Sequence, residues 1–244
     1  MATEPTAAKP PPPAFPHRER LALALDVESL ERAVELAAAL APYLGVAKVG
    51  LELYSAAGPA AVEALRELGL SVFVDLKLHD IPTTVERAAA VLGSLGVAYA
   101  TVHTAGGAPM CAAAAAGLAA GAARAGLPAP VGLGVTVLTS EAAASPELLT
   151  ARAALAAAAG LRGLVCGAPD LPAVRAAAPG LLTVVPGTRP PGAALDDQAR
   201  TATPAEALAA GADLLVIGRA VTHAPDPVAA ALTLHEHLAT AATW

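Results

Sequence analysis

Four charged side chains lie in three short apolar segments near the start of the chain. Asp26 ends the segment LALALDV, Lys48 lies within VAKVGL, and Asp75 and Lys77 lie two residues apart in VFVDLKLHD. Two carboxylates and two ammonium groups can neutralise one another, whereas an unpaired charge in a protein interior costs several kcal/mol. Such an array suits electrostatic and acid–base chemistry, because fixed charges stabilise charge that develops on a bound molecule.

Each of these residues also has an ordinary structural interpretation. An aspartate at the end of a strand often caps the next helix, and a strand lysine often extends its ammonium group to solvent. Because side chains alternate along a strand, Asp75 and Lys77 are predicted to point to one side and their apolar neighbours to the other. The four charges together therefore favour a preorganised network that faces a pocket.

The elements that must position these charges follow from a regular alternation that starts near Arg20. Short apolar runs rich in β-branched residues alternate with helical patterns, which is typical of βα units around a parallel sheet. Eight runs are predicted as strands: Leu21–Val27, Val46–Leu51, Ser71–Leu78, Tyr99–Thr104, Val131–Leu138, Gly163–Gly167, Leu182–Pro186 and Leu214–Gly218. Seven stretches are predicted as helices: Ser29–Leu40, Ala56–Leu68, Thr83–Leu95, Pro109–Ala125, Pro146–Ala159, Pro204–Ala210 and Pro227–Leu238.

This order of elements predicts an α/β protein with the (β/α)8 architecture of a TIM barrel. Eight strands, each followed by a helix, fit about 225 residues. An open doubly wound sheet is the alternative, but it usually has fewer strands, and no GxGxxG follows Leu21–Val27. We expect residues 18–244 to form one barrel domain. Residues 1–17, which start with the Pro- and Ala-rich MATEPTAAKPPPPAFP, are predicted to be a disordered tail.

The composition excludes several classes of partner. The chain has 244 residues, 55% of them hydrophobic, but charged residues or Pro/Gly pairs interrupt every stretch of the length that a spanning helix needs, about 20 apolar residues. A net charge of −6 and only 2% aromatic residues argue against nucleic acid. The two cysteines suggest neither a disulfide framework nor a zinc site. We therefore expect a soluble cytoplasmic protein.

A second group of candidate residues follows the last two predicted strands. Arg189 comes after the seventh strand, and Gly218 and Arg219 follow the eighth. In TIM barrels the active site lies at the carboxyl ends of the strands, and the loops after strands 7 and 8 commonly bind phosphate. Guanidinium groups and backbone N–H groups are suitable phosphate donors. The alternative is that both arginines simply lie on the surface.

The segment from Asp75 to Thr84, DLKLHDIPTT, resembles the signature D-x-K-x-x-D-I-P-x-T of the orotidine 5′-monophosphate decarboxylase family. The resemblance extends through most of Leu21–Pro227, and the proline-rich tail lies outside it. Further matching motifs occur in the family's order: LALDV around Asp26, AKVGLEL around Lys48, VHTAGGAPM, VTVLTS, VCGAPD, VPGTRP, DDQAR and VIGRAVTHAPDP. Several motifs in the right order are far more specific than any one of them.

The resemblance implies cofactor-independent decarboxylation of orotidine 5′-monophosphate to UMP in de novo pyrimidine biosynthesis. Lys77 would stabilise the carbanion at C6 and then protonate it, and Asp75 would face the departing carboxylate. Lys48 and Asp26 would hold the array and contact the ribose hydroxyls. No pyridoxal phosphate, thiamin or flavin site is suggested by the residues, so fixed charge would supply most of a barrier reduction on the order of 20 kcal/mol.

The resemblance also implies a phosphate site and a shared dimer site. Gln198 would contact the phosphate together with Arg189, Gly218 and Arg219, and residues 190–200 would form a lid. Thr139 or Ser140 would contact the pyrimidine, and the sequence does not choose between them. Asp80 lies beyond the third strand, on the rim before Pro82. In the resembled family this aspartate, with Ile81 and Thr84, completes the neighbouring subunit's array, which implies a homodimer.

Two other functions were weighed. Related barrels of the 3-keto-gulonate 6-phosphate decarboxylase and hexulose-phosphate synthase group use Mg²⁺, and they have a carboxylate ligand where this chain has Lys48. A nucleotide-binding regulator without catalysis would not need an interior lysine flanked by acids. A metal held by His79 and His103 is disfavoured because the Lys77 cation would compete for the same side. His223 is expected on the surface.

Overall fold

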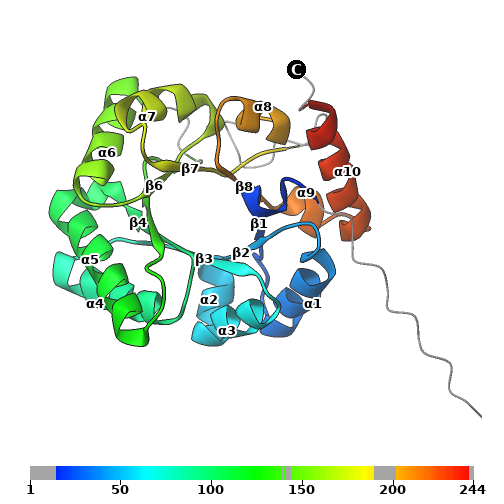
Figure 1. Ribbon diagram of the computed structural model, residues 1–244, viewed down its shortest axis with the longest axis horizontal. Helices are drawn as coiled ribbons and strands as arrows, with labels where there is room; N and C mark the ends of the chain where they lie inside the picture. The colour runs from blue at the N-terminus through cyan, green and yellow to red at the C-terminus, as the bar shows by residue number, and fades with distance from the viewer. Residues whose placement is uncertain (1–14, 139, 141–143, 190–201, 242–244) are drawn as a thin grey trace, which may run out of the picture.

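The computed structural model describes residues 15–138, 140, 144–189 and 202–241 of the chain. Eight parallel strands form a closed barrel in which each strand pairs with its neighbour in sequence and β8 pairs with β1. Figure 1 shows the ring of strands with the helices arranged around its outside. The predicted TIM barrel is therefore confirmed.

The strands and helices have the following bounds. The strands are β1 (Leu21–Ala24), β2 (Val46–Val49), β3 (Ser71–Leu78), β4 (Tyr99–His103), β5 (Val131–Val135), β6 (Gly163–Val165), β7 (Leu182–Val185) and β8 (Leu214–Ile217). The helices are α1 (Leu30–Leu40), α2 (Leu51–Ala57), α3 (Pro59–Glu67), α4 (Pro82–Ser94), α5 (Gly107–Ala125), α6 (Pro146–Ala158), α7 (Leu171–Ala177), α8 (Pro204–Ala209), α9 (Arg219–Thr222) and α10 (Pro227–Ala241). Three 3-10 turns are η1 (Arg18–Arg20), η2 (Thr104–Gly106) and η3 (Ala168–Asp170).

Alternation along each strand separates a lumen face from an outer face. The apolar lumen is filled by Ala22, Ala24, Val46, Phe73, Leu133, Val135, Val165, Val184, Leu214 and Val216. The outward residues of the same strands, such as Leu21 and Leu23, pack under the helices in a second and larger core. Asp26, Lys48 and Asp75 share the sequence parity of the lumen residues, which places their side chains above the apolar lumen.

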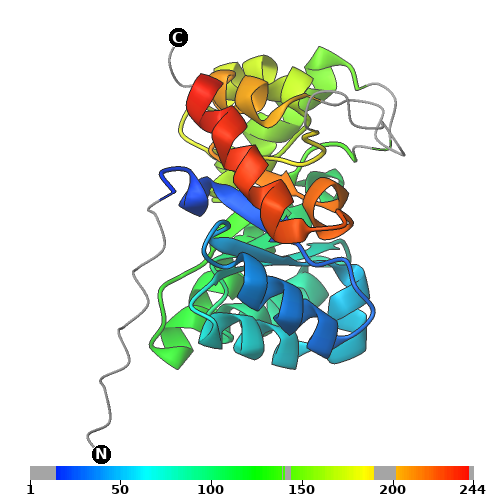
Figure 2. The ribbon, with the colours of Figure 1, turned by 90° about the vertical axis from the view of Figure 1, so that its right-hand side faces the viewer.

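The two ends of the barrel differ. At the amino ends of the strands the guanidinium of Arg20, in η1, donates to the carbonyl oxygens of Ala212 and Asp213, which directly precede β8. Figure 2 shows η1, in blue, on the opposite side of the barrel from α9, in orange, which follows the carboxyl end of β8. The predicted charges lie at the end opposite η1, where a cavity opens.

The predicted tail is only partly described. Residues 1–14 lie outside the described residues. Phe15 is described, and its ring lies 5.1 Å from the ring of Tyr43 and 4.4 Å from that of His235, centroid to centroid. Phe15 therefore packs against the barrel, a few residues before the first strand.

The predicted elements differ from the structure mainly at their ends. Most predicted strands run one to three residues too far, because the last residues have left the ladder and line the rim. The predicted helix Ala56–Leu68 is α3 together with the last two residues of α2, because Gly58 adopts a φ of 57° and Pro59 starts a new first turn. The rest of α2 was not predicted. Two short helices, α7 and α9, were not predicted because neither is long enough to repeat an apolar period.

Helix α5 is longer and more apolar than expected. Thr104–Ala125 meets the length and composition of a membrane-spanning helix, because the helix continues through Pro109 in its first turn. In the structure α5 is one of the outer helices, and its own residues Met110, Cys111 and Ala114 are buried on the side that faces the barrel core. Burial raises the pKa of the Cys111 thiol, and both Cys111 and Cys166 are buried, as predicted.

Helices α4 and α5 contact each other through glycine. A methyl group on Gly121 of α5 would fall inside van der Waals distance of the Ala90 carbonyl of α4, and one on Gly117 would meet the Glu86 carbonyl. Gly93 of α4 is in the same position against the Leu118 carbonyl. This contact holds together the βα units of β3 and β4, whose strands carry the residues at the open end.

We expect Gly121→Ala to destabilise the fold by about 1–3 kcal/mol, although Gly to Ala in an exposed helix is usually stabilising. The reason is steric, since the added methyl group forces α5 away from the backbone of α4. Urea unfolding measures the change, with the exposed Ala120→Ser as a control within about 0.5 kcal/mol of the parent. A Gly121→Ala protein as stable as the parent would contradict this packing.

Candidate active site

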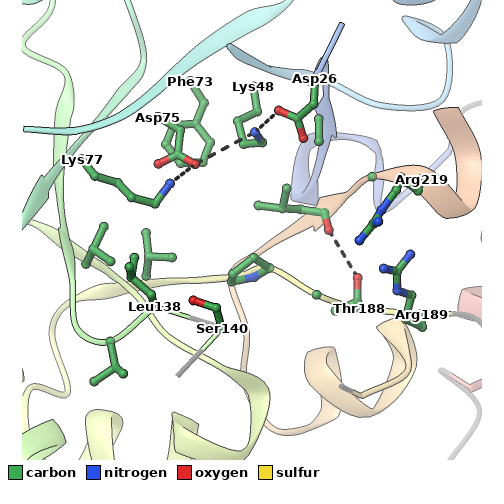
Figure 3. A pocket seen from close by; sticks show the side chains of 18 of the residues that line it. Asp26, Lys48, Phe73, Asp75, Lys77, Leu138, Ser140, Thr188, Arg189 and Arg219 are labelled. Carbon is green, nitrogen blue, oxygen red and sulfur yellow. Dashed lines mark hydrogen bonds and ion pairs between the residues drawn. The ribbon is translucent and has the colours of Figure 1, made fainter. Parts of the chain in front are cut away.

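A cavity of about 600 Å³ opens at the carboxyl ends of the strands. Its lining includes Asp26, Lys48, Phe73, Asp75, Lys77, Val135, Leu138, Ser140, Thr188, Arg189, Gly218, Arg219 and His223. Figure 3 shows the acids and lysines along one side and the two arginines together at another part of the wall. The structure thus brings residues from nearly the whole length of the barrel sequence, from Ala24 to His223, together around one cavity.

The four charges form a chain of alternating sign. Lys48 Nζ lies 2.9 Å from Asp26 Oδ1 and 4.0 Å from Asp75 Oδ2. Lys77 Nζ lies 2.9 Å from the same Asp75 Oδ2. Asp75 is therefore shared by two lysines and Lys48 by two aspartates, which is the mutual neutralisation that the sequence predicts (Figure 3).

Burial is uneven along this chain of charges. The Lys48 side chain is 9% exposed and that of Asp75 15%, whereas Lys77 is 33% and Asp26 58% exposed. The two inner charges depend most on their partners, because a buried unpaired charge is strongly destabilising. Gly50 leaves room for this pairing, since a Cβ there would lie 2.8 Å from Asp26 Oδ1 and 3.2 Å from Lys48 Nζ.

The backbone of β3 is irregular at Lys77. The β3–β4 register shifts between Val74 and Leu78, and Lys77 has a φ of 51°, the one positive φ among the described residues that are not glycine. The prediction that Asp75 and Lys77 point to the same side, with Leu76 and Leu78 on the other, is correct, and the alternation continues through a bulge. Left-handed backbone at a non-glycine residue is strained and clusters at functional sites.

Thr101 on β4 is a polar residue that the sequence analysis missed. Its hydroxyl accepts a hydrogen bond from Lys77 N at 2.8 Å and donates one to Asp75 Oδ1 at 3.0 Å. Its position along the strand could have identified it. Thr101 lies two residues after Tyr99, which packs against the lumen core, so alternation places Thr101 on the same lumen face. A threonine at a lumen position needs a polar partner.

The arginine part of the wall is built by the loops after β7 and β8. Arg189 N donates to the Ala202 carbonyl at 3.0 Å, and Thr188 forms a β-bridge with Ala202. Arg219 begins α9, directly after Gly218. His223, expected on the surface, is exposed but also lines the cavity, because it follows Arg219 by one helical turn. Sequence reasoning missed this position since α9 was not predicted.

Other predicted site residues lie elsewhere. Asp80, Ile81 and Thr84 are exposed on the rim and do not line the cavity of the described chain, and Ile81 N donates to Asp80 Oδ1 at 2.6 Å. Ser140 lines the cavity, whereas Thr139 and the whole predicted lid, residues 190–200 with Gln198, lie outside the described residues.

The histidines weighed as metal ligands form a different arrangement. The rings of His79 and His103 stack at 5.5 Å, and His103 Nδ1 accepts a hydrogen bond from Ala105 N. Within the described ranges, no group of three His, Cys, Asp or Glu side chains converges as a metal site would require. The chemistry available from the described residues is that of fixed charges and of lysine as an acid.

The fold and the site together define a (β/α)8-barrel enzyme that carries a lysine–aspartate array at the carboxyl ends of its strands. The model of the family described as "Orotidine 5'-phosphate decarboxylase / HUMPS family" matches residues 19–234. The chain belongs to this family.

Individual relatives agree with this assignment. An orotidine 5′-phosphate decarboxylase of Anaeromyxobacter sp. (strain K) is 52% identical over 224 residues, which cover 87% of this chain and 95% of the relative. One of Moorella thermoacetica is 48% identical over 226 residues, 88% of this chain and 90% of the relative. The crystal structure of the Lactobacillus acidophilus enzyme of that name is similar with a TM-score of 0.77 and 33% identity, covering 90% of this chain and 99% of that one.

Proposed function

We propose that this chain decarboxylates orotidine 5′-monophosphate to UMP and CO₂ in pyrimidine biosynthesis. The observation that carries the proposal is the alternating array of Asp26, Lys48, Asp75 and Lys77 on one wall of the cavity, with two arginines farther along the same cavity. A phosphorylated substrate can reach both, with its phosphate at the arginines and its reacting base at the lysines.

Lys77 is the residue proposed to act on the reacting carbon. When the bond between C6 and the carboxyl carbon breaks, CO₂ leaves and the electron pair stays on C6, in an orbital that the ring π system cannot delocalise. The Lys77 ammonium, 2.9 Å from Asp75, stabilises this pair electrostatically and then donates a proton to form the C6–H bond. The neutral amine regains a proton from solvent after UMP leaves.

Asp75 is proposed to act on the leaving group. A substrate carboxylate about 4 Å from the Asp75 carboxylate is repelled by roughly 4 kcal/mol at an effective dielectric near 20. That repulsion disappears as CO₂ departs, so the two carboxylates favour the transition state over the bound substrate. Lys48 keeps the Asp75 charge in place and, with Asp26, contacts the ribose hydroxyls.

The phosphate is proposed to bind at the other part of the wall. Arg189 and Arg219 supply guanidinium donors, Gly218 a backbone N–H, and Gln198 a side-chain amide. Contacts this far from C6 can still lower the barrier when they tighten in the transition state. Either Thr139 or Ser140 is the proposed contact to the pyrimidine, and the place of Ser140 in the cavity lining supports Ser140.

The Mg²⁺-dependent members of the family are the second candidate. Those enzymes place a carboxylate metal ligand where this chain has Lys48. Here Lys48 Nζ is 2.9 Å from Asp26 and 4.0 Å from Asp75, so a cation of the protein occupies the space between the two carboxylates. This position of Lys48 favours the decarboxylase that acts on the nucleotide.

The proposal includes a cytoplasmic homodimer with shared sites. The rim residues Asp80, Ile81 and Thr84 are exposed and do not line the cavity of the described chain, and Ile81 is 66% exposed, which is unusual for a large apolar side chain. A second copy of the chain covers this residue and receives Asp80. Two buried cysteines that form no disulfide, Cys111 and Cys166, suit a reducing compartment.

Purified protein incubated with orotidine 5′-monophosphate should release CO₂ and change the ultraviolet absorbance of the base. Full activity should remain after treatment with a chelator, because no step of the proposed reaction uses a metal ion. Lys77→Ala should lose at least about 10³-fold in kcat/KM, since it removes the proton donor. Absence of turnover, or activity that only Mg²⁺ restores, would refute the proposal.

Arg219→Ala should lose several kcal/mol of transition-state stabilisation with the nucleotide and almost none with the phosphate-free nucleoside. The difference arises because only the nucleotide carries the group that the guanidinium binds. Steady-state kcat/KM on both substrates measures it. Equal losses on the two substrates would mean that Arg219 has a structural role instead.

Mixing Lys77→Ala with Asp80→Ala protein, each nearly inactive alone, should restore about a quarter of the parent activity. Random subunit exchange gives about half heterodimers, and each heterodimer has one site with both lesions and one with neither. Mass spectrometry verifies the heterodimers. If they form and remain inactive, Asp80 acts in its own subunit and the shared site is wrong.

A further inference from the structure

The pairing of β3 with β4 is interrupted at the array. Val74 pairs with Ala100 and Leu78 pairs with Val102, so three residues of β3 lie opposite Thr101 alone. The bulge gives Lys77 a φ of 51°. A lysine keeps such a conformation only when its surroundings hold it there.

The Thr101 hydroxyl is the group that holds this bulge. It accepts the hydrogen bond of Lys77 N at 2.8 Å, which replaces the ladder bond that the register shift removes. Because the hydroxyl has one proton, that proton is left for Asp75 Oδ1, 3.0 Å away. Thr101 is 1% exposed, so no water competes for either bond.

The same hydroxyl determines how the Asp75 carboxylate is turned. With Oδ1 bound to Thr101, Oδ2 faces the lysines, at 2.9 Å from Lys77 Nζ and 4.0 Å from Lys48 Nζ. Thr101 itself does not line the cavity of the described chain. One uncharged residue thus fixes both the backbone of one member of the array and the side chain of another without reaching a ligand.

We propose that Thr101 is a positioning residue of the decarboxylation, an inference that rests on the proposed function. By holding the Lys77 backbone and the Asp75 carboxylate together, it sets the distance and direction of the ammonium group relative to the reacting carbon. Small errors in such geometry are costly, because a displacement of about 1 Å can lower a rate by about 10²-fold.

The test compares Thr101→Val, which keeps the shape and removes the hydroxyl, with Thr101→Ser, which keeps the hydroxyl. Thr101→Val should lower kcat by about 10- to 100-fold and change KM for the nucleotide by less than about 3-fold, because the phosphate contacts are intact. Thr101→Ser should stay within about 3-fold of the parent kcat. If Thr101→Val does not fold, Thr101→Ala, which adds no bulk, takes its place.

Thr183→Val is the matched control. Thr183 on β7 is also 1% exposed, and its hydroxyl lies 2.9 Å from Asp213 Oδ2 and 3.2 Å from the Gly211 carbonyl oxygen, and accepts a hydrogen bond from Arg175, away from the cavity. This change removes the same kind of buried hydroxyl–carboxylate bond, so it should lower the unfolding temperature comparably and leave kcat unchanged. A kcat loss that followed stability alone would affect both variants equally.

Three results would overturn the proposal: a parent-like kcat in Thr101→Val, a Thr101→Ser as impaired as Thr101→Val, or an equal loss in Thr183→Val. The failure of the proposed function is distinguishable, since the parent protein would then not turn over the nucleotide at all. In that case a crystal structure of Thr101→Val tests the positioning role directly. If the Lys77 backbone and the Asp75 carboxylate keep their parent conformations in this variant, Thr101 does not position them.

Discussion

The ion pairing of Lys48 and Asp75 inside the open end of the barrel is the interaction on which the rest of the site depends. Both side chains are more than four-fifths buried, and each would be strongly destabilising without a partner of opposite sign. The outer charges, Asp26 and Lys77, complete the neutralisation at 2.9 Å each. An array that is neutral as a whole can keep charged groups in a low-dielectric site, where they act most strongly on a substrate.

This requirement explains several local features that are otherwise unfavourable. A glycine at position 50 leaves space for the Asp26–Lys48 pair. The left-handed backbone at Lys77 breaks the β3–β4 ladder, and Thr101 replaces the lost bond. Behind them, the glycine contacts of α4 and α5 pack the helices of these two βα units closely against each other. Strain at the site is thus balanced by packing outside the barrel.

Much of this was predictable because the governing pattern is local. Period-two alternation places Asp26, Lys48 and Asp75 on the lumen parity, and the alternation of strand and helix patterns predicts the barrel. The order of the motifs predicts the family, which the relatives confirm. The bulge at Lys77 was not predictable, since it depends on how β4 pairs with β3. Thr101 and His223 were missed for a similar reason: one acts through a contact across strands, and the other follows a helix too short to leave a pattern.

The central claim, that the charges act as one unit, is tested most directly by a double-mutant cycle on kcat/KM for decarboxylation of orotidine 5′-monophosphate. The variants are Asp75→Asn, Lys77→Met and the double variant, measured by release of labelled CO₂. If the two residues act together, the double variant should lose little more than the more impaired single variant, as groups that work as a unit are strongly non-additive. Losses that simply multiply would contradict the account, because Asp75 and Lys77 would then contribute independently.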